Sequence, residues 1–153
     1  MFVSKKYYYI CVFKYCFSYI SIVSKIFNIS EAAAIAIHSM VVIARSNVQM
    51  NVQQVAAATG YSKNHTAKVL QHLAKNRFLH SVRGPRGGFV MGKKAEDISL
   101  MDIYSSMEGE LEESPCKMDC MHCPFDRCIF GGLDRKFNEE FKQYMNNKKL
   151  ASV

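Results

Sequence analysis

Residues 52–91 read VQQVAAATGYSKNHTAKVLQHLAKNRFLHSVRGPRGGFVM, and this stretch decides the fold. Its first half predicts a short helix over Val52–Thr59, a tight turn at Gly60, and a longer helix from Ser62 to about Asn76. Glycine suits a turn residue with positive φ, and serine can cap the helix that follows it. Three small residues at 56–58, all alanine, are expected to let the two helices approach closely. The pattern is that of a helix-turn-helix unit.

The second predicted helix has two distinct faces. Residues at helical spacing on the core face are Thr66, Val69, Leu70 and Leu73. Residues on the other face are Asn64, Lys68, Gln71 and Lys75. Lysine can donate to guanine in a major groove, and Asn or Gln can pair with adenine. The exposed, solvated face of any helix gives the same pattern, so the segment that follows has to decide between the two interpretations.

That segment predicts a β-hairpin. Two short runs, Leu79–Val82 and Phe89–Met91, flank the turn sequence RGPRGG at residues 83–88. Glycines let the backbone approach a partner closely, and the guanidinium groups of Arg83 and Arg86 can reach phosphates or enter a minor groove. A basic hairpin directly after a helix-turn-helix is a wing, which favours binding to double-stranded DNA.

The distribution of charge agrees with this interpretation. The chain has 153 residues and a formal net charge of +7. Residues 26–95 hold nine Lys or Arg against Glu31 alone, whereas residues 96–153 hold seven basic and twelve acidic residues. A strongly basic part beside an acidic one indicates a polyanion partner for the basic part. The length is that of one domain and excludes a multidomain enzyme.

Three further helices are expected around this unit. Ser30 can cap a helix over EAAAIAIHSMVVIARS, which is apolar on most sides and should be buried. Ser99 and Asp102 form a capping box that opens a short helix through about Met107. A longer helix runs from about residue 132 to 147, with large apolar residues at helical spacing: Leu133, Phe137, Phe141 and Tyr144. The winged helix is too small to cover this stripe, so a second copy of the chain is the expected cover.

Four cysteines, Cys116, Cys120, Cys123 and Cys128, lie within thirteen residues, separated by three, two and four. So many thiols so close together, without a convincing secretory signal, favour a metal or redox site over a disulfide framework. Sets of four cysteines serve both zinc and iron-sulfur clusters, and spacing does not choose between them. A thioredoxin-like enzyme would need a βαβ context around the CxxC at 120–123, which is missing, and no other catalytic set is evident, so we expect a non-enzyme.

The order of residues 60–62 (GYS), 68–70 (KVL) and above all 81–89 (SVRGPRGGF) resembles the Rrf-two family of winged helix-turn-helix regulators, of the IscR and NsrR type. The resemblance covers roughly residues 27–150. It implies a fold that is mainly α with a small β-hairpin wing and a long C-terminal dimerisation helix. It also implies a homodimeric transcriptional regulator, expected to be a repressor, on a pseudo-palindromic operator. The candidate DNA-contacting residues are Ser62, Lys63, Asn64, Lys68, Gln71, Arg83, Arg86, Gly87 and Gly88.

The same resemblance favours an iron-sulfur cluster, with zinc as the alternative. Sensing members of the family carry three cysteines just before the dimer helix, and Cys116, Cys123 and Cys128 align best with them. Their gaps of six and four residues depart from the family pattern, and Cys120 is additional. Cys120 is the leading candidate for the fourth ligand. His38 is the alternative, because other members complete the site with an acid or a histidine from the first helix of the partner subunit.

The first 25 residues differ in composition from the rest. The run YYYICVFKYCFSYISIV at residues 7–23 is 17 residues long and has Lys14 at its centre, whereas a spanning helix needs about 20 mostly apolar residues. We expect residues 1–25 to be an extension from a mis-assigned start. Residues 26–95 are then the winged helix-turn-helix, and residues 96–153 are the cysteine segment and dimerisation helix of the same domain. We expect a cytoplasmic protein that is not bound to a membrane.

Overall fold

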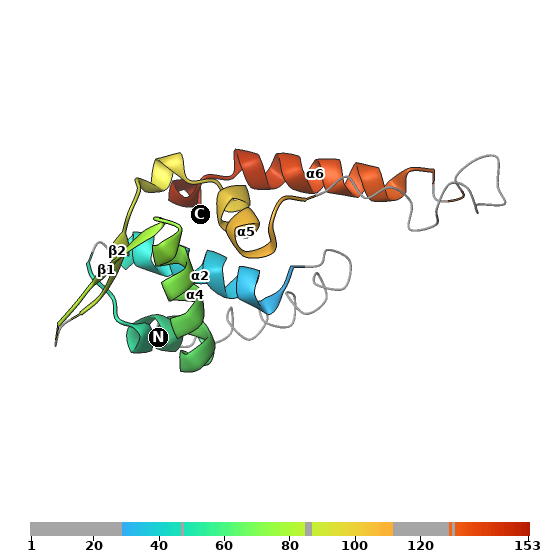
Figure 1. The fold of residues 1–153 in the computed structure, drawn as a ribbon. Coiled ribbons are helices and arrows are strands. Elements are labelled where there is room, and N and C mark those ends of the chain that lie inside the picture. Colours follow the sequence, from blue (N-terminus) through green and yellow to red (C-terminus); the bar gives the residue numbers. More distant parts are fainter. Residues whose placement is uncertain (1–28, 47, 85–86, 112–128, 130) are drawn as a thin grey trace, which may run out of the picture.

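The computed structural model describes residues 29–46, 48–84, 87–111, 129 and 131–153. Its helices and strands are α2 (Glu31–Ser46), α3 (Val52–Thr59), α4 (Lys63–Lys75), β1 (Leu79–Val82), β2 (Gly88–Met91), α5 (Leu100–Glu108) and α6 (Leu133–Asn147). Two short 3-10 helices, η1 (Ala95–Asp97) and η2 (Leu150–Ser152), complete the order shown in Figure 1. The described part is mainly helical with a single antiparallel hairpin, which confirms the predicted fold class.

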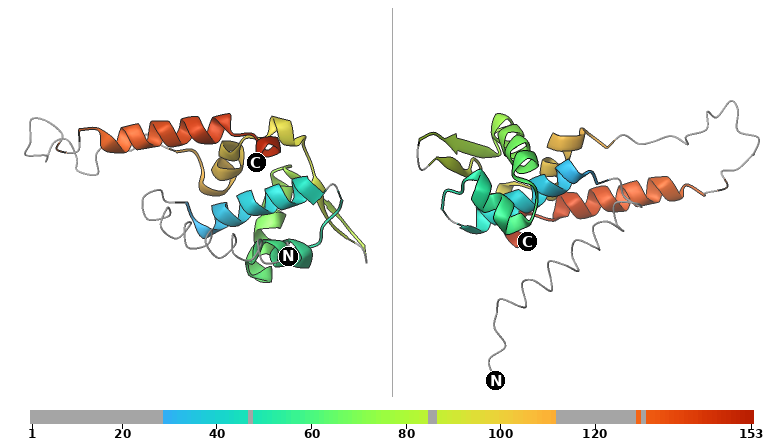
Figure 2. Two further views of the ribbon diagram at one scale, coloured as in Figure 1. Left: turned by 180° about the vertical axis from the view of Figure 1, so that it is seen from behind. Right: turned by 90° about the horizontal axis from the view of Figure 1, so that it is seen from below.

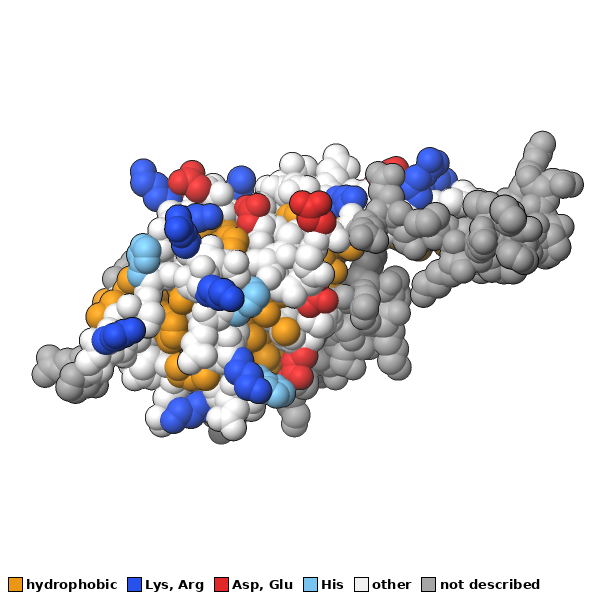
Figure 3. Space-filling view, in the orientation of Figure 1, with side chains coloured by type: hydrophobic (Ala, Val, Ile, Leu, Met, Phe, Trp, Pro, Cys, Tyr) orange, Lys and Arg blue, Asp and Glu red, His pale blue; other side chains and the backbone are white. Residues whose placement is uncertain are grey.

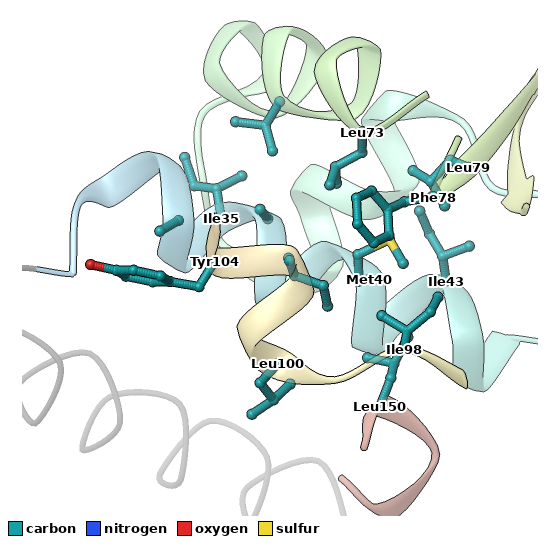
Figure 4. Packing of buried hydrophobic residues seen from close by; sticks show 14 of the residues in the cluster. Ile35, Met40, Ile43, Leu73, Phe78, Leu79, Ile98, Leu100, Tyr104 and Leu150 are labelled. Atoms are coloured by element: carbon teal, nitrogen blue, oxygen red, sulfur yellow. The ribbon is translucent and has the colours of Figure 1, made fainter. Parts of the chain in front are cut away.

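Helix α2 is the centre of the core. It packs against α3, α4 and α5, and its side chains Ile35, Met40 and Ile43 are almost completely buried. Figure 4 shows Met40 and Ile43 on the side of Phe78 and Leu79, whereas Ile35 lies on the side of Tyr104. A helix that is apolar on most sides needs partners on most sides, and α2 has them.

Helices α3 and α4 form the predicted helix-turn-helix. Gly60 has φ +76 and its N–H donates to the carbonyl of Ala56 at 2.9 Å, and Ser62 caps α4 by accepting from the N–H of His65 at 3.2 Å. The expectation for the three alanines was wrong at two positions: Ala56 is buried, but Ala57 and Ala58 are exposed. A two-turn helix turns only one face to the core, and the successive positions 57 and 58 point away from it.

The hairpin pairs Leu79 with Met91 and Val82 with Gly88, so β2 begins one residue earlier than predicted. Strand β2 is anchored to the loop between α2 and α3, because Met50 and Phe89 exchange two backbone hydrogen bonds of 3.1 and 2.8 Å. Met50 therefore helps to fix the wing relative to the helices, together with the packing of β1 on α4 and of β2 on α2.

The capping box at Ser99 and Asp102 is present, and α5 follows it as predicted. Helix α6 lies beside α5, where Tyr104 and Phe141 meet edge to face with ring centroids 5.3 Å apart. Figures 1 and 2 show α6 running past the end of α5 and away from the rest of the described chain. The predicted apolar stripe is only partly covered, since Leu133 and Tyr144 are 48% and 62% exposed.

Candidate nucleic-acid interface

The outward face of α4 carries the predicted polar side chains. Ser62, Lys63, Asn64, Lys68, Gln71 and Lys75 are all exposed. The predicted core face is buried, with Thr66, Leu70 and Leu73 at 0% exposure and Val69 at 5%. Because residues 64, 68, 71 and 75 recur at intervals of three and four, their side chains form one ridge along the helix.

The surface around this ridge is basic. Figure 3 shows Lys and Arg side chains along the face that α4 presents, whereas Asp and Glu side chains lie above it, toward α5 and α6, and at its edge, where Glu31 of α2 pairs with His65. Among the residues described, α4 contains no acid at all. A basic ridge on a helix whose opposite face is locked into the core suits a polyanion, since the ridge can enter a groove without disturbing the fold.

The wing carries its predicted basic residues in the turn between β1 and β2. Arg83 follows β1 and is exposed, while Arg86 lies outside the described residues. Gly87 and Gly88 have packing reasons to be glycine. A Cβ on Gly87 would lie 2.6 Å from the carbonyl oxygen of Val82, and one on Gly88 would lie 2.6 Å from the carbonyl oxygen of Met50. These contacts close the turn and seat the wing, and contact of either glycine with DNA stays a prediction.

His38 lies where α2 meets the turn of the helix-turn-helix. Its Nδ1 is 2.8 Å from the carbonyl oxygen of Ala34 and 3.1 Å from the hydroxyl of Tyr61. The carbonyl can only accept, so this geometry puts a proton on Nδ1 and leaves the lone pair on Nε2. Burial lowers the pKa of His38 below its ordinary value of 6.5, although the hydrogen bond to Ala34 opposes this. A neutral imidazole with a free Nε2 has the form of a metal ligand.

The four cysteines proposed as ligands lie at 116–128, outside the described residues. Within the described ranges no group of three His, Cys, Asp or Glu side chains is arranged to hold a metal ion. His38 as a fourth ligand therefore stays a prediction, as does Cys120.

Two connections at the back of α4 were missed by sequence reasoning. His72 Nε2 lies 2.6 Å from the carbonyl oxygen of Ser106 in α5, and His65 pairs with Glu31 of α2 at 3.6 Å. Both histidines lie at the edge of the core face, seven residues apart on the same side of the helix. Their place at the edge of the core face could have indicated contacts with neighbouring helices. It could not identify the partners, because each partner is 34 residues away in the sequence.

Comparison with known proteins gives a family and a fold. Residues 29–153 match the sequence model of a family, Rrf2, which is described as "Iron-dependent Transcriptional regulator". The chain is similar to the HTH-type transcriptional regulator IscR of Klebsiella pneumoniae (26% identical over 99 residues) and of Serratia proteamaculans (29% over 101). Each match covers 65% of this chain. The matched region spans only 61% of the length of the Klebsiella protein and 60% of the length of the Serratia protein.

Solved structures share the fold. The IscR structure of T. potens matches with a TM-score of 0.64 at 21% identity, over 80% of this chain and 82% of that one. The structure of CymR, the global cysteine regulator of B. subtilis, matches with a TM-score of 0.66 at 20% identity, over 81% and 93% of the two chains. In the described part of this chain, no helix has both the length and the apolar character needed to cross a membrane.

Proposed function

Because the chain belongs to the Rrf2 family of transcriptional regulators, we propose that it is a homodimeric repressor whose operator affinity depends on a metal or redox centre in its cysteine segment. Membership in this family assigns the chain to DNA-binding regulators, and it confirms the expectation of a non-enzyme. The regions matched in the named relatives cover less than two thirds of their length, so the activity, signal and partners of the whole protein belong to this proposal.

The observation that carries the proposal is the exposed ridge on α4. Its four polar side chains face outward from a helix whose other face is buried, and Arg83 of the wing is exposed as well. In the proposed complex α4 lies in the major groove, where Asn64, Lys68 and Gln71 donate to base edges. Arg83 and Arg86 of the wing reach phosphates or the minor groove.

A homodimer is supported by the exposed apolar side chains of α6. Leu133, Phe137 and Tyr144 are 48%, 39% and 62% exposed, which is unusual for a stripe of large apolar groups in a single copy. Pairing α6 with the same helix of a second copy covers them. Two-fold symmetry then sets two copies of α4 one DNA turn, or a multiple of it, apart.

The proposal of a metal or redox centre rests on the ligand chemistry of the four cysteines. Four thiols within residues 116–128 offer a complete set of sulfur ligands for an iron-sulfur cluster, and the same set fits zinc. An iron-sulfur cluster would supply a one-electron or oxidant-sensitive switch, whereas zinc would only stabilise the fold. We place Cys116, Cys123 and Cys128 in the set, with Cys120 as the fourth ligand and His38 as the alternative.

Metal analysis tests this part. The full chain is purified without oxygen, and its iron, acid-labile sulfide, zinc and visible absorption are measured. Iron and sulfide in equal amounts with visible absorption support the cluster. A colourless protein with stoichiometric zinc contradicts cluster sensing and leaves DNA binding standing.

DNA binding is tested by fluorescence anisotropy with duplexes from the region upstream of the protein's own gene. We expect Lys68→Ala to weaken specific binding by about 1–3 kcal/mol, which is roughly 5- to 150-fold, because one base contact is lost. Lys149→Ala is the matched control, since Lys149 is also exposed but directly precedes η2, outside the helix-turn-helix and the wing. Equal losses in both variants, or equal affinity of the wild type for a scrambled duplex, would show that α4 does not read the operator.

A further inference from the structure

A side-chain hydrogen bond from His72 joins the recognition helix α4 to α5. The imidazole Nε2 lies 2.6 Å from the backbone oxygen of Ser106, and a carbonyl oxygen can only accept, so Nε2 carries the proton and donates. Ser106 is in the last turn of α5, where the carbonyl groups have no partner within the helix. His72 therefore supplies a hydrogen bond that the end of α5 lacks.

The end of α5 is also the point where the chain leaves toward its cysteines. The helix stops at Glu108, Gly109 follows with φ +83, and Cys116 is seven residues further on. In the same last turn, Glu108 accepts a hydrogen bond from the hydroxyl of Ser30, the residue whose side chain caps α2. The last turn of α5 is thus bonded to two helices of the DNA-binding unit, to α4 through His72 and to the start of α2 through Ser30.

A groove of about 350 Å³ lies beside the bond from His72, mainly between α2 and α4 and with Met107 of α5 at its edge, and its lining includes Ile35 and Val69. Figure 3 views the surface on this side, with hydrophobic side chains visible between the charged groups. His72 is one of the residues that line this groove, so its bond to Ser106 links α4 to α5 at the groove's edge.

We propose that His72 is a positioning residue that couples the cysteine segment, through the last turn of α5, to the setting of the recognition helix. This proposal rests on the proposed sensing function, and it names the residues through which the cysteine segment would act on α4. When the segment reorders, the carbonyl of Ser106 moves and the donor on α4 follows it, so the polar ridge meets the operator in a different position.

The test compares operator affinity in two states of the full-length protein, metal-loaded and metal-free, and takes the ratio of the two dissociation constants. His72→Leu removes the donor, and His72→Gln keeps an N–H that can reach the same carbonyl. His65→Leu is the matched control, because it lies on the same side of α4 but contacts Glu31 of α2 and not the end of α5. Thermal unfolding of each variant accompanies the titrations.

We expect His72→Leu to lower the ratio by about 2- to 12-fold, which is the worth of one hydrogen bond, and His72→Gln to restore it. His65→Leu is expected to leave the ratio unchanged even where it weakens both affinities. An undiminished ratio in His72→Leu, or an equal fall in His65→Leu, overturns the coupling while the sensing function stands. A wild-type ratio of 1 overturns the sensing function and the coupling with it.

A second measurement needs no metal. Coupling is reciprocal, so operator binding should change the state of the cysteine segment by the same path. The alkylation rate of Cys116, Cys120, Cys123 and Cys128 in the metal-free protein is followed by peptide mass spectrometry, with and without operator duplex. Operator DNA is expected to change these rates in the wild type and in His72→Gln but not in His72→Leu. The same change in all three proteins overturns the proposal.

Discussion

Replacing Gly88 with alanine should detach the wing from the helices. The new Cβ would lie 2.6 Å from the carbonyl oxygen of Met50, 2.8 Å from its carbonyl carbon, and 3.1 Å from the backbone nitrogen of Asn51. All three are backbone atoms, so no flexible side chain can move aside. Strand β2 must instead shift away from residue 50, where Met50 and Phe89 exchange hydrogen bonds of 3.1 and 2.8 Å.

The cost follows from those two hydrogen bonds. Each is worth about 0.5–1.5 kcal/mol, so their loss lowers the free energy of unfolding by about 1–3 kcal/mol. The buried ring of Phe89, only 7% exposed, is next in the strand and adds to the cost if it is drawn out of the core. Operator affinity should fall as well, since the wing loses its fixed position relative to α4.

Urea unfolding followed by circular dichroism measures the first effect, and anisotropy titration measures the second. Ser81→Ala is the control: Ser81 pairs with Phe89 in the same hairpin, its side chain is exposed, and the change adds no atoms. We expect that variant to remain within about 0.5 kcal/mol of the wild type. A Gly88→Ala protein of wild-type stability would refute the assignment of Gly88 as the seat of the wing.

Three further predictions concern the core, a histidine and α6. Ser39→Ala should raise the free energy of unfolding by about 1 kcal/mol in urea titration, because the buried Ser39 hydroxyl has no hydrogen-bond partner within the described chain. For His38, burial holds the pKa in the folded protein below the ordinary 6.5, so only the unfolded chain gains a proton as the pH first drops past that value. Stability should therefore decline below about pH 6.5, and His38→Gln should show a smaller decline when urea midpoints are compared across that pH. The double variant Leu133→Asp/Tyr144→Asp should sediment as a monomer where the wild type sediments as the proposed dimer, because it puts charge on the exposed stripe.

Sequence reasoning located the helix-turn-helix and the hairpin to within a residue because local chemistry determines them. Gly60 takes the positive φ that the turn requires, and Ser62 accepts from a backbone N–H of the helix it begins. Both requirements depend only on neighbours in the chain. The exposed and buried faces of α4 were also predictable, since helical spacing alone sorts them.

The connections that position the site could not be predicted in the same way. His72 meets Ser106 across 34 residues, and Met50 pairs with Phe89 across 39. Neither pairing leaves a periodic signal, because each joins a side chain or backbone group to a segment brought near only by the completed fold. Gly88 shows the consequence: its position in a glycine-rich turn suggested approach to DNA, but it gave no sign that a Cβ there would meet the backbone of Met50.

The arrangement of apolar groups on α6 shows why a helix of this kind needs a second copy. Along one side of the helix, Phe141 reaches Tyr104 of α5, and Met145 is 5% exposed, so this edge of the stripe is used by the core. At about 100° per residue, Leu133 and Tyr144 lie on the opposite edge of the same stripe, where they are 48% and 62% exposed. A helix that packs only on its own core needs no second apolar edge. Because full burial of a large apolar side chain is worth about 1.5–3 kcal/mol, covering these two half-exposed groups would contribute roughly half of that value each. An identical helix presenting the same edge offers a matching cover. The proposed dimer would then set the spacing between the two recognition helices through the same helix that follows the cysteine segment.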